Sequence, residues 1–501
     1  MGLKHALPLS VSIAFVIECC KSRARVFRDQ SGKIRVKARN KDLMPELTII
    51  GGGLSGCEAA WQAAKRGIQV TLYEMRPKKS TGAHVTGDLA ELVCSNSLGS
   101  LLPDRASGVL KNELSALGSL LLACAEESAV PAGFALAVDR ERFSGLIGQK
   151  LTAHPNIRVL RQEITELPVG PTVIASGPLT SPDLAHAIQQ FTGEDSLYFY
   201  DAVAPVIAAE SIDLSIAFRA SRYHQREDEG GGDYLNCPLS NEEYDAFVTE
   251  LLAAERIPLK PFEQEILSGV HAGSGKFFES CLPVEIIVER SRNALKFGPM
   301  RPVGLHDPRT GQRSGAILQL RQDNLAGSLY NMVGFQTNLT YAEQKRVFRM
   351  IPGLQNAEFV RYGQMHRNTF LCSPLLLQPT MQSNQREDLF MAGQITGVEG
   401  YLGNIATGLL AGINAALFLK NEPLIVLPET TMLGALCHYI THTSLMDFQP
   451  MKANFGILPP LRNPKRGRRE RSVQYADRAS EDLHAFLRHF STLVPDGREV
   501  E

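Results

Sequence analysis

A glycine-rich turn at residues 51–56 constrains this chain more than any other stretch. A strand is expected before it, at 46–50, a helix after it, and a second strand at 69–73 that leads to the acid Glu74. In a G-x-G-x-x-G turn the first glycine permits the tight turn, the second leaves room for a pyrophosphate, and the third lets helix and strand pack closely. The helix start offers free N–H groups to phosphates, and an acid roughly 20 positions further on accepts ribose hydroxyls. The stretch predicts a dinucleotide site made by Gly51, Gly52, Gly53, Leu54, Ser55, Gly56 and Glu74.

Two later strand ends also carry small residues. An apolar strand ends at Gly177, and another ends at Gly393 and Gln394. Such ends let a dinucleotide come close, with no side chain in the way. An apolar helix expected at 404–419 would then point its positive N-terminal end at the flavin edge where negative charge gathers on reduction. Together the three turns favour a resident FAD, contacted along its length, over an NAD that binds only briefly.

The length of 501 residues exceeds one ordinary core, so more than one domain is expected. After residue 200 the chain is richer in charge, which predicts a domain inserted into the nucleotide fold. The expected class is α/β, with a Rossmann-like FAD-binding domain in two segments and an inserted α+β domain. The expected parts are an extension at 1–45, the FAD-binding domain at 46–199 and 326–458, the inserted domain at 200–325, and a basic tail with a helix at 459–501. Further helices are expected at 108–122, 140–152 and 242–255, and β structure at 286–289 and 315–321.

The first 45 residues differ from the rest. Residues 21–41 carry nine basic side chains against the single acid Asp29. We expect an extension that is disordered and dispensable, or a true start at Met44; an organelle transit peptide is the alternative. No apolar run reaches the roughly 18 residues that cross a bilayer, so no membrane association and a cytoplasmic location are expected.

Charge and cysteine content exclude several classes of protein. The 52 basic and 53 acidic residues give a formal net charge of −1, so any attraction to nucleic acid must come from local patches. The nine cysteines form no C-x-x-C pair and no Cys/His ligand spacing. Neither a disulfide framework nor a metal site is indicated, and the thiols are free for chemistry.

Several short segments of the sequence closely resemble those of the folate-dependent, FAD-containing tRNA uracil-5-methyltransferases. The resemblance runs in order from about Glu46 to the basic tail. It rests on segments such as LYEMRP (72–77), ELVCSNSL (91–98), YLNCPLS (234–240), ESCLPVE (279–285), LKFGPMRPVGL (295–305), QLRQDN (319–324) and MAGQITGVEGY (391–401).

The resemblance implies a reaction. In that family 5,10-methylenetetrahydrofolate supplies a one-carbon unit to C5 of the T-loop uridine of tRNA, reduced FAD supplies electrons, and NADPH or NADH is the reductant. A thiolate that adds to C6 of uracil makes C5 nucleophilic. Two cysteines lie in matching words with polar neighbours: we expect Cys237 to attack C6 and Cys94 to act beside the flavin, although these roles can be exchanged. Buried, inert thiols are expected at Cys57, Cys124 and Cys437, and more often than not at Cys281 and Cys372.

Contacts to folate and RNA are less closely defined. Folate needs a cation and a stacking surface, for which the candidates are Arg301, Tyr341, His366 and Arg367. Phosphates of tRNA need basic side chains on one surface. The candidates are Arg219 and Arg222 in the inserted domain and the tail cluster of Arg462, Lys465, Arg466, Arg468, Arg469 and Arg471.

Two other functions stay open. One is the related flavoprotein that installs carboxymethylaminomethyl groups on the wobble uridine, although we expect this chain to be without the long helical C-terminal domain of that family. The other is a non-catalytic, flavin-bearing RNA-binding protein that uses the fold as a scaffold. The oligomeric state is open as well.

Overall fold

This computed structural model describes residues 24–28, 34–38, 46–193, 197–202, 204–222, 232–257, 282–309, 311, 313–445 and 448–490. The chain divides into two units, residues 1–45 and 46–501. In the first unit β1 (Ala24–Arg28) pairs antiparallel with β2 (Ile34–Ala38). The other predictions for residues 1–45, including the start at Met44, lie outside the described residues.

A five-stranded parallel sheet organises the second unit. Its strand order is β18-β9-β3-β4-β8. The strands are β3 (Glu46–Ile50), β4 (Gln69–Glu74), β8 (Ile157–Arg161), β9 (Thr172–Ile174) and β18 (Leu389–Met391). Four of them come from the first segment of the chain and β18 from a segment about 200 residues later, so this α/β domain is built from two segments, as expected.

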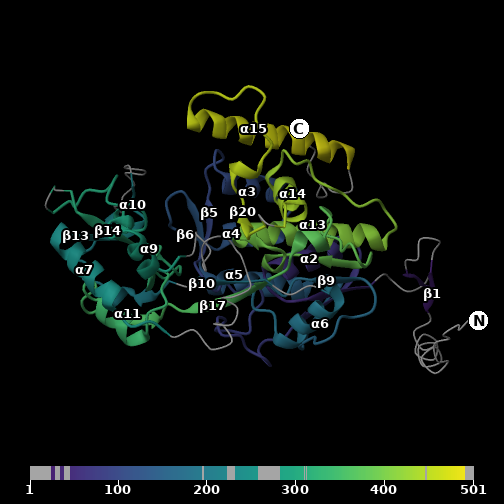
Figure 1. Ribbon diagram of the computed structural model, residues 1–501, viewed down its shortest axis with the longest axis horizontal. Helices are drawn as coiled ribbons and strands as arrows, with labels where there is room; N and C mark the ends of the chain where they lie inside the picture. The colour runs from purple at the N-terminus through teal and green to yellow at the C-terminus, as the bar shows by residue number, and fades with distance from the viewer. Residues whose placement is uncertain are drawn as a thin grey trace, which may run out of the picture. The chain divides into compact units, whose positions relative to one another are not determined.

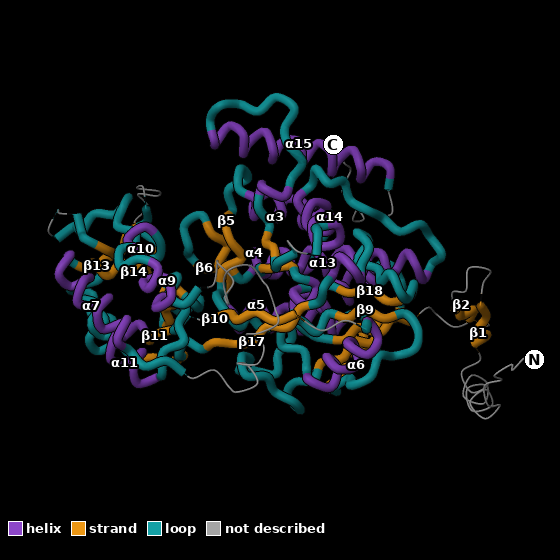
Figure 2. Tube along the Cα trace, viewed as in Figure 1, coloured by secondary structure: helices purple, strands orange, loops and turns teal. Residues whose placement is uncertain are grey.

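Two helices pack against each other and against this sheet: α2 (Leu54–Lys65) and α13 (Tyr401–Leu419). The close approach depends on glycine. A Cβ at Gly408 would lie 2.3 Å from the carbonyl oxygen of Ser55. The glycines and alanines of α13 therefore let its backbone reach α2, and the tube of Figure 2 shows α13 beside strands β9 and β18.

Contrary to the expectation from sequence, helix α13 is long and apolar enough to cross a membrane, by length and composition. Of its apolar window, 89% is buried inside the protein, which is the behaviour of a core helix. The helix begins at Tyr401, three residues before the predicted start.

The remainder of the first segment covers the sheet. The helix predicted at 108–122 is two helices, α3 (Ala106–Ala116) and α4 (Leu120–Glu127), which meet at 114°. The chain breaks there because Ser119 caps α4 by accepting the N–H of Leu122. A small antiparallel sheet of order β5-β7-β6 lies beside them, made by β5 (Ser97–Ser100), β6 (Ala129–Val130) and β7 (Ala135–Val138). Helices α5 (Arg140–Ala153) and α6 (Pro182–Thr192) complete the segment.

The inserted domain is a six-stranded antiparallel sheet of order β12-β13-β14-β15-β11-β16, with a core of its own. Its strands are β11 (Val206–Ala208), β12 (Phe218–Ala220), β13 (Tyr234–Leu239), β14 (Ala316–Gln322), β15 (Leu329–Met332) and β16 (Phe359–Arg361). Its helices are α7 (Asn241–Ala253), α9 (Val284–Arg290), α10 (Ala294–Phe297) and α11 (Tyr341–Phe348).

Two expectations for this domain are wrong. Its C-terminal boundary does not fall at residue 325, because β15, α11 and β16 belong to the same sheet and core, to which Phe335 and Phe348 contribute. Residues 286–289 are not a strand; they lie in α9, where Val284 and Val288 are buried four positions apart, which is helical spacing. The domain thus ends near Arg361, and the ladder between β10 (Leu197–Ala202) and β17 (Met365–Phe370) joins it to the α/β domain.

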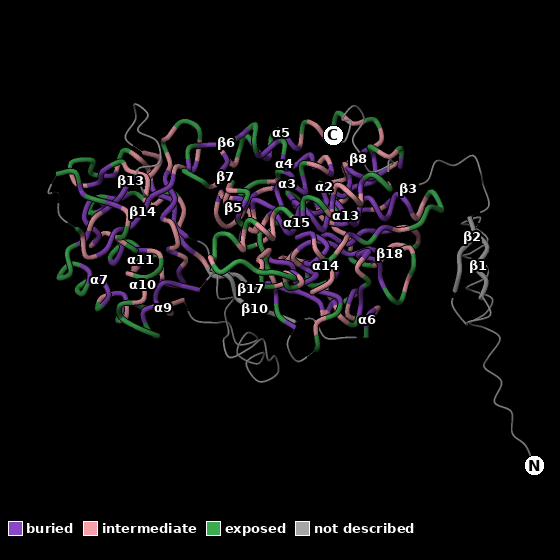
Figure 3. Tube along the Cα trace, turned by 90° about the horizontal axis from the view of Figure 1, so that it is seen from above, coloured by how far each residue is buried: buried purple, intermediate pink, exposed green. Residues whose placement is uncertain are grey.

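The C-terminal part adds α14 (Met432–His442) and α15 (Arg468–His489). Helix α15 packs on α3 and lies along the outside of the domain, at the top of Figure 1. Buried residues, purple in Figure 3, gather in each of the two domains, in keeping with two separate large cores.

Candidate functional site

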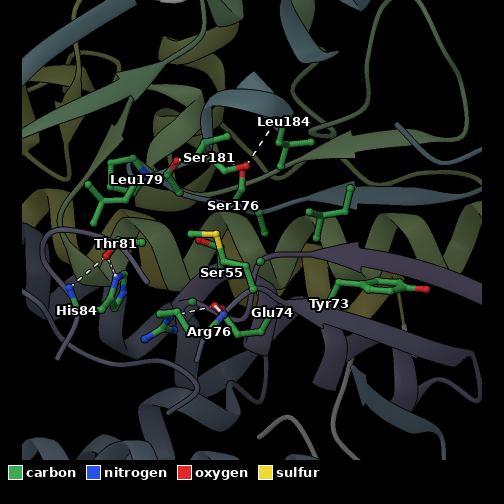
Figure 4. Close-up of a pocket in the computed structure, with 18 of the residues that line it drawn as sticks. Ser55, Tyr73, Glu74, Arg76, Thr81, His84, Ser176, Leu179, Ser181 and Leu184 are labelled. Carbon is green, nitrogen blue, oxygen red and sulfur yellow. Dashed lines mark hydrogen bonds and ion pairs between the residues drawn. The ribbon is translucent and has the colours of Figure 1, made fainter. Parts of the chain in front are cut away.

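A cavity opens at the carboxyl ends of β3, β4 and β9. Its volume is about 130 Å³, and it is partly open to solvent. Seven of the residues predicted from sequence line it: Gly51, Gly53, Leu54, Ser55, Glu74, Gly177 and Gln394. Gly52, Gly56 and Gly393 do not line it. A Cβ on Gly56 would meet backbone, and a Cβ on Gly52 or Gly393 would meet neighbouring side chains. Figure 4 shows Ser55 between the Glu74–Arg76 wall and the wall that carries Ser176 and Ser181.

Each glycine of the first turn has a separate structural reason. Gly51 has φ +106°, and a Cβ on it would lie 2.4 Å from the carbonyl oxygen of Ala175. A Cβ on Gly56 would lie 1.9 Å from the carbonyl oxygen of Gly51. Gly53 differs, because a Cβ there would meet nothing within 4 Å. No side chain caps the helix α2 that starts after it, so open space and free N–H groups meet at one place.

Glu74 is a buried, ionised acceptor in the cavity wall. Its Oε2 accepts the N–H of Gly52 at 2.9 Å, and its Oε1 accepts the backbone and side-chain N–H groups of Arg76, both at 2.9 Å. Burial alone raises the pKa of this carboxyl, but the hydrogen bonds and the charge of Arg76 outweigh burial and hold the pKa below its ordinary value. Arg76 also pairs with Glu91 at 2.9 Å, which fixes this wall to the following loop.

The start of α13 brings two further groups to the cavity. Gly400 precedes it with φ +84°, and no side chain caps the helix. Tyr401 and Asn404 both line the cavity. Asn404 is only 8% exposed, and its Oδ1 has no hydrogen-bond partner among the described residues. A buried amide oxygen without a partner is costly, so the cavity offers an acceptor that a ligand donor can satisfy.

Cys94 lies at the edge of this cavity. Its N–H donates to Tyr401 Oη at 2.8 Å, and the preceding Val93 lines the cavity. The thiol residue is partly exposed. The segment ELVCSNSL (91–98), which contains Cys94, therefore lies where the cavity meets the inserted domain.

Three arginines from distant parts of the chain hold the Cys94 loop. Arg140 of α5 donates to the carbonyl oxygen of Cys94 at 2.8 Å and pairs with Asp323 at 2.9 Å. Arg361 of β16 donates to the carbonyl oxygen of Val93. Arg321 of β14 donates from Nε to Asn96 Oδ1 at 2.9 Å.

These guanidinium groups are electrostatically coupled to Cys94. Burial lowers the pKa of Arg321 and Arg361, whereas for Arg140 the carboxylate of Asp323 outweighs burial and the pKa is raised. A negative charge on Cys94 acts to raise the pKa of all three. Three cations that hold the loop of a partly exposed thiol, one of them paired with Asp323, favour negative charge on that thiol. Sequence reasoning missed these arginines because they are far apart in the chain, although Arg321 and Asp323 stand in the word QLRQDN.

The structure does not bring Cys237 to this site. Cys237 lies in β13, opposite Leu318 of β14, and is fully buried in the core of the inserted domain. Burial raises the pKa of its thiol to about 12. The expectation that Cys237 is the nucleophile is therefore corrected: it fills the core as a small apolar residue.

The remaining cysteines divide as follows. Cys57, Cys124 and Cys437 are buried, as predicted, while Cys372 is partly exposed. Cys19, Cys20 and Cys281 lie outside the described residues.

The candidates for folate and RNA contacts are spread over the surface. Tyr341 is 43% exposed and stacks on Tyr362, with ring centroids 4.7 Å apart. Arg301 is exposed, and His366 and Arg367 belong to β17, where only the backbone is described. Arg219 and Arg222 bond within the inserted domain, to Tyr330 Oη and Gln319 Oε1. In the tail cluster Arg471 is half-buried and the others are exposed.

Known proteins resemble this chain over most of its length. Residues 46–423 match the family model described as glucose inhibited division protein A. The chain is 54% identical over 446 residues to a methylenetetrahydrofolate–tRNA-(uracil-5-)-methyltransferase from Exiguobacterium sp., which covers 89% of this chain and 99% of that relative. The chain belongs to this methyltransferase family. The relative with the same name from Anoxybacillus flavithermus is 52% identical over 443 residues, or 88% of this chain and 99% of that relative.

Membership of the family confirms the resemblance inferred from the short sequence segments.

Solved structures agree on the fold. The GidA protein of Aquifex aeolicus matches in two crystal forms, with TM-scores of 0.63 and 0.62 and 15% and 16% identity. Each match covers 91% of this chain and 75% or 77% of the other. At such identity the likeness concerns the fold alone, and it confirms the α/β class with a parallel sheet.

Proposed function

We propose that this chain transfers a one-carbon unit from 5,10-methylenetetrahydrofolate to C5 of the T-loop uridine of tRNA, which gives ribothymidine. Reduced FAD is the proposed electron donor, and NADPH or NADH is the reductant. The observation that supports the proposal most is the hydrogen bond between the Cys94 N–H and Tyr401, because Tyr401 lines the same cavity as the residues of the dinucleotide motif.

The residues of the cavity fit FAD. The open space before Gly53 and the uncapped start of α2 suit a pyrophosphate. The Glu74 carboxylate suits a ribose hydroxyl, and Asn404 Oδ1 offers a buried acceptor without a partner. FAD bound here would supply the electron pair that turns a methylene group into a methyl group.

We assign the covalent role at C6 of uracil to Cys94, which exchanges the two thiol roles expected from sequence. A thiolate that adds to C6 places negative charge on the ring, and C5 becomes the nucleophile. Arg140, Arg321 and Arg361 stabilise the thiolate before it attacks. Tyr401 holds the loop by accepting the Cys94 N–H. No second thiol is assigned among the described residues, and Arg301 and Tyr341 stay predictions for folate.

One reaction mixture tests the function. The purified protein is checked for bound FAD and incubated with unmethylated tRNA, 5,10-methylenetetrahydrofolate and NADPH or NADH, and the digested nucleosides are analysed by mass spectrometry. Ribothymidine at the T-loop position is expected. In a parallel mixture that also contains glycine as the source of the carboxymethylamino group, a carboxymethylaminomethyl product at the wobble uridine supports the related flavoprotein instead. FAD and tRNA binding without any modified nucleoside supports the non-catalytic alternative.

A further inference from the structure

A second cavity, of about 820 Å³, lies where the start of α15 meets the start of α3 and the short helix η5 (Phe455–Ile457). Figure 1 shows α15 crossing over α3. Four arginines line the cavity: Arg105, Arg468, Arg469 and Arg471. None of its lining residues, all of them described, is acidic.

Little of this positive charge is neutralised within the described residues. Asp104 pairs with both Arg105, at 3.5 Å, and Arg469, at 3.3 Å, so one carboxylate is shared by two guanidinium groups. Arg471 donates to the neutral carbonyl oxygens of Lys465 and Arg466, which fixes its position and leaves its charge in place. The side chain of Arg469 is 85% exposed and faces solvent.

The backbone adds to the same field. The eleven-residue helix α3 begins at the cavity wall with Ala106, has no side-chain cap, and carries no acid in its first turn. Its positive end therefore acts in the same direction as the arginines. The rings of Tyr475 and Phe455 are already stacked on each other, with centroids 5.5 Å apart, and Arg478 lies over Tyr475. These contacts favour a phosphate ligand over a stacked base.

We propose that this arginine cavity binds backbone phosphates of the tRNA substrate. Phosphodiesters present closely spaced negative charges that suit several guanidinium groups at once. The whole chain has a net charge of −1, so attraction to RNA has to come from a local patch such as this one. The proposal deepens the proposed function and rests on it for the identity of the RNA.

The cavity is within reach of a tRNA whose uridine lies at Cys94. Arg105 follows Cys94 closely in sequence, and so short a connection spans at most about 36–40 Å even when fully extended. The connection is held in place: Lys111 of α3 donates to the carbonyl oxygens of Leu98 and Ser100 in β5, at 2.9 Å and 2.8 Å. The cavity therefore keeps a fixed position relative to the thiol. It holds the RNA through backbone phosphates away from the reacting base.

The test compares two double variants that remove equal charge. Arg468→Ala with Arg469→Ala removes two cavity arginines, and Arg158→Ala with Arg488→Ala removes two exposed arginines outside it. Dissociation constants for an unmodified tRNA transcript are measured over a range of salt concentrations. We expect the cavity variant to bind roughly tenfold more weakly, with a salt slope smaller by about 1.5 to 2, and the control to bind as the unmodified protein does. The KM of the cavity variant for tRNA rises, while the kcat and the flavin content of that variant stay unchanged.

Equal tRNA affinity and salt slope in the two double variants would overturn the proposal. A cavity variant with a raised KM for NADPH and unchanged tRNA affinity would also overturn it, in favour of a free nucleotide. If the unmodified protein binds tRNA through the cavity arginines and makes no ribothymidine, the proposed function fails and the anchor stands.

Discussion

Tyr401 and Cys94, 307 positions apart in the chain, are joined by a hydrogen bond of 2.8 Å from the Cys94 N–H to the Tyr401 hydroxyl oxygen. Tyr401 begins α13 in the second segment of the α/β domain, and Cys94 belongs to a loop of the first. Because Tyr401 also lines the cavity at the carboxyl ends of β3, β4 and β9, the two segments meet beside that cavity at Cys94.

Replacing Tyr401 with Phe removes this acceptor. The N–H of Cys94 then loses its partner and the loop loses one of its restraints, which costs on the order of 1–2 kcal/mol in positioning. We expect ribothymidine formation in a single turnover to slow roughly tenfold while FAD content is kept. Tyr73→Phe is the matched control, since Tyr73 lines the same cavity. Equal rates for the two variants would show that the Tyr401 hydroxyl does not position the thiol.

Replacing Gly53 with Ala tests the pyrophosphate cradle. Gly53 has φ −78°, which alanine adopts freely, and the added Cβ would meet no protein atom within 4 Å. The fold should therefore be unaffected, whereas FAD content should fall at least roughly tenfold because the methyl group takes the space of the phosphate.

The matched control is Gly145→Ala in the middle of α5, where a Cβ also meets nothing within 4 Å. That variant should keep its FAD and gain about 0.5–1 kcal/mol of helix stability. Flavin released per protein chain is measured by absorbance for both. Full FAD content in Gly53→Ala would contradict the assignment of the turn.

Glu113 should make stability depend on pH. It is 2% exposed, and burial raises the pKa of its carboxyl to about 7, although the N–H groups of Met432 and Leu433 at the start of α14 donate to it. The folded state therefore holds this proton more tightly than the unfolded state. Its contribution to stability is fully present below the ordinary carboxyl pKa and is lost as pH rises through about 7.

Glu113→Gln, which cannot ionise, isolates this effect. Between pH 5 and pH 8 the free energy of unfolding of the unmodified protein should fall by about 2 to 3 kcal/mol relative to that of the variant. Urea denaturation at the two pH values measures the difference. A constant difference would show that Glu113 titrates in its ordinary range.

Local patterns predicted much of the fold and of the cavity. The positive φ of Gly51 and the close approach of Gly56 to Gly51 are demands that act within a few residues, and the structure shows both, whereas at Gly53 it shows open space. Gly177 and Gln394 could be predicted to lie near the same site because each follows a strand, and the strands of a parallel sheet end at one shared edge. The domain boundary was missed because the core residues Phe335 and Phe348 stand in a stretch without a change of composition.

The chemistry of the site depended on long-range contacts. Cys94 and Cys237 look alike in sequence, since each stands beside polar residues in a segment that matches the family. Only the fold shows that Cys237 is buried in a core while Cys94 is partly exposed next to a cavity-lining residue. The arginines at 140, 321 and 361 come from three elements, so no local spacing reveals that they converge on one loop.

The most direct test of the account compares Cys94→Ala with Cys237→Ala in the formation of ribothymidine on unmethylated tRNA. Both proteins should contain FAD. We predict that Cys94→Ala forms no ribothymidine, and that Cys237→Ala keeps most of its activity with a loss of stability of about 1 kcal/mol from the core. A Cys94→Ala protein that methylates tRNA at the normal rate, beside an inactive but folded Cys237→Ala protein, would contradict the account.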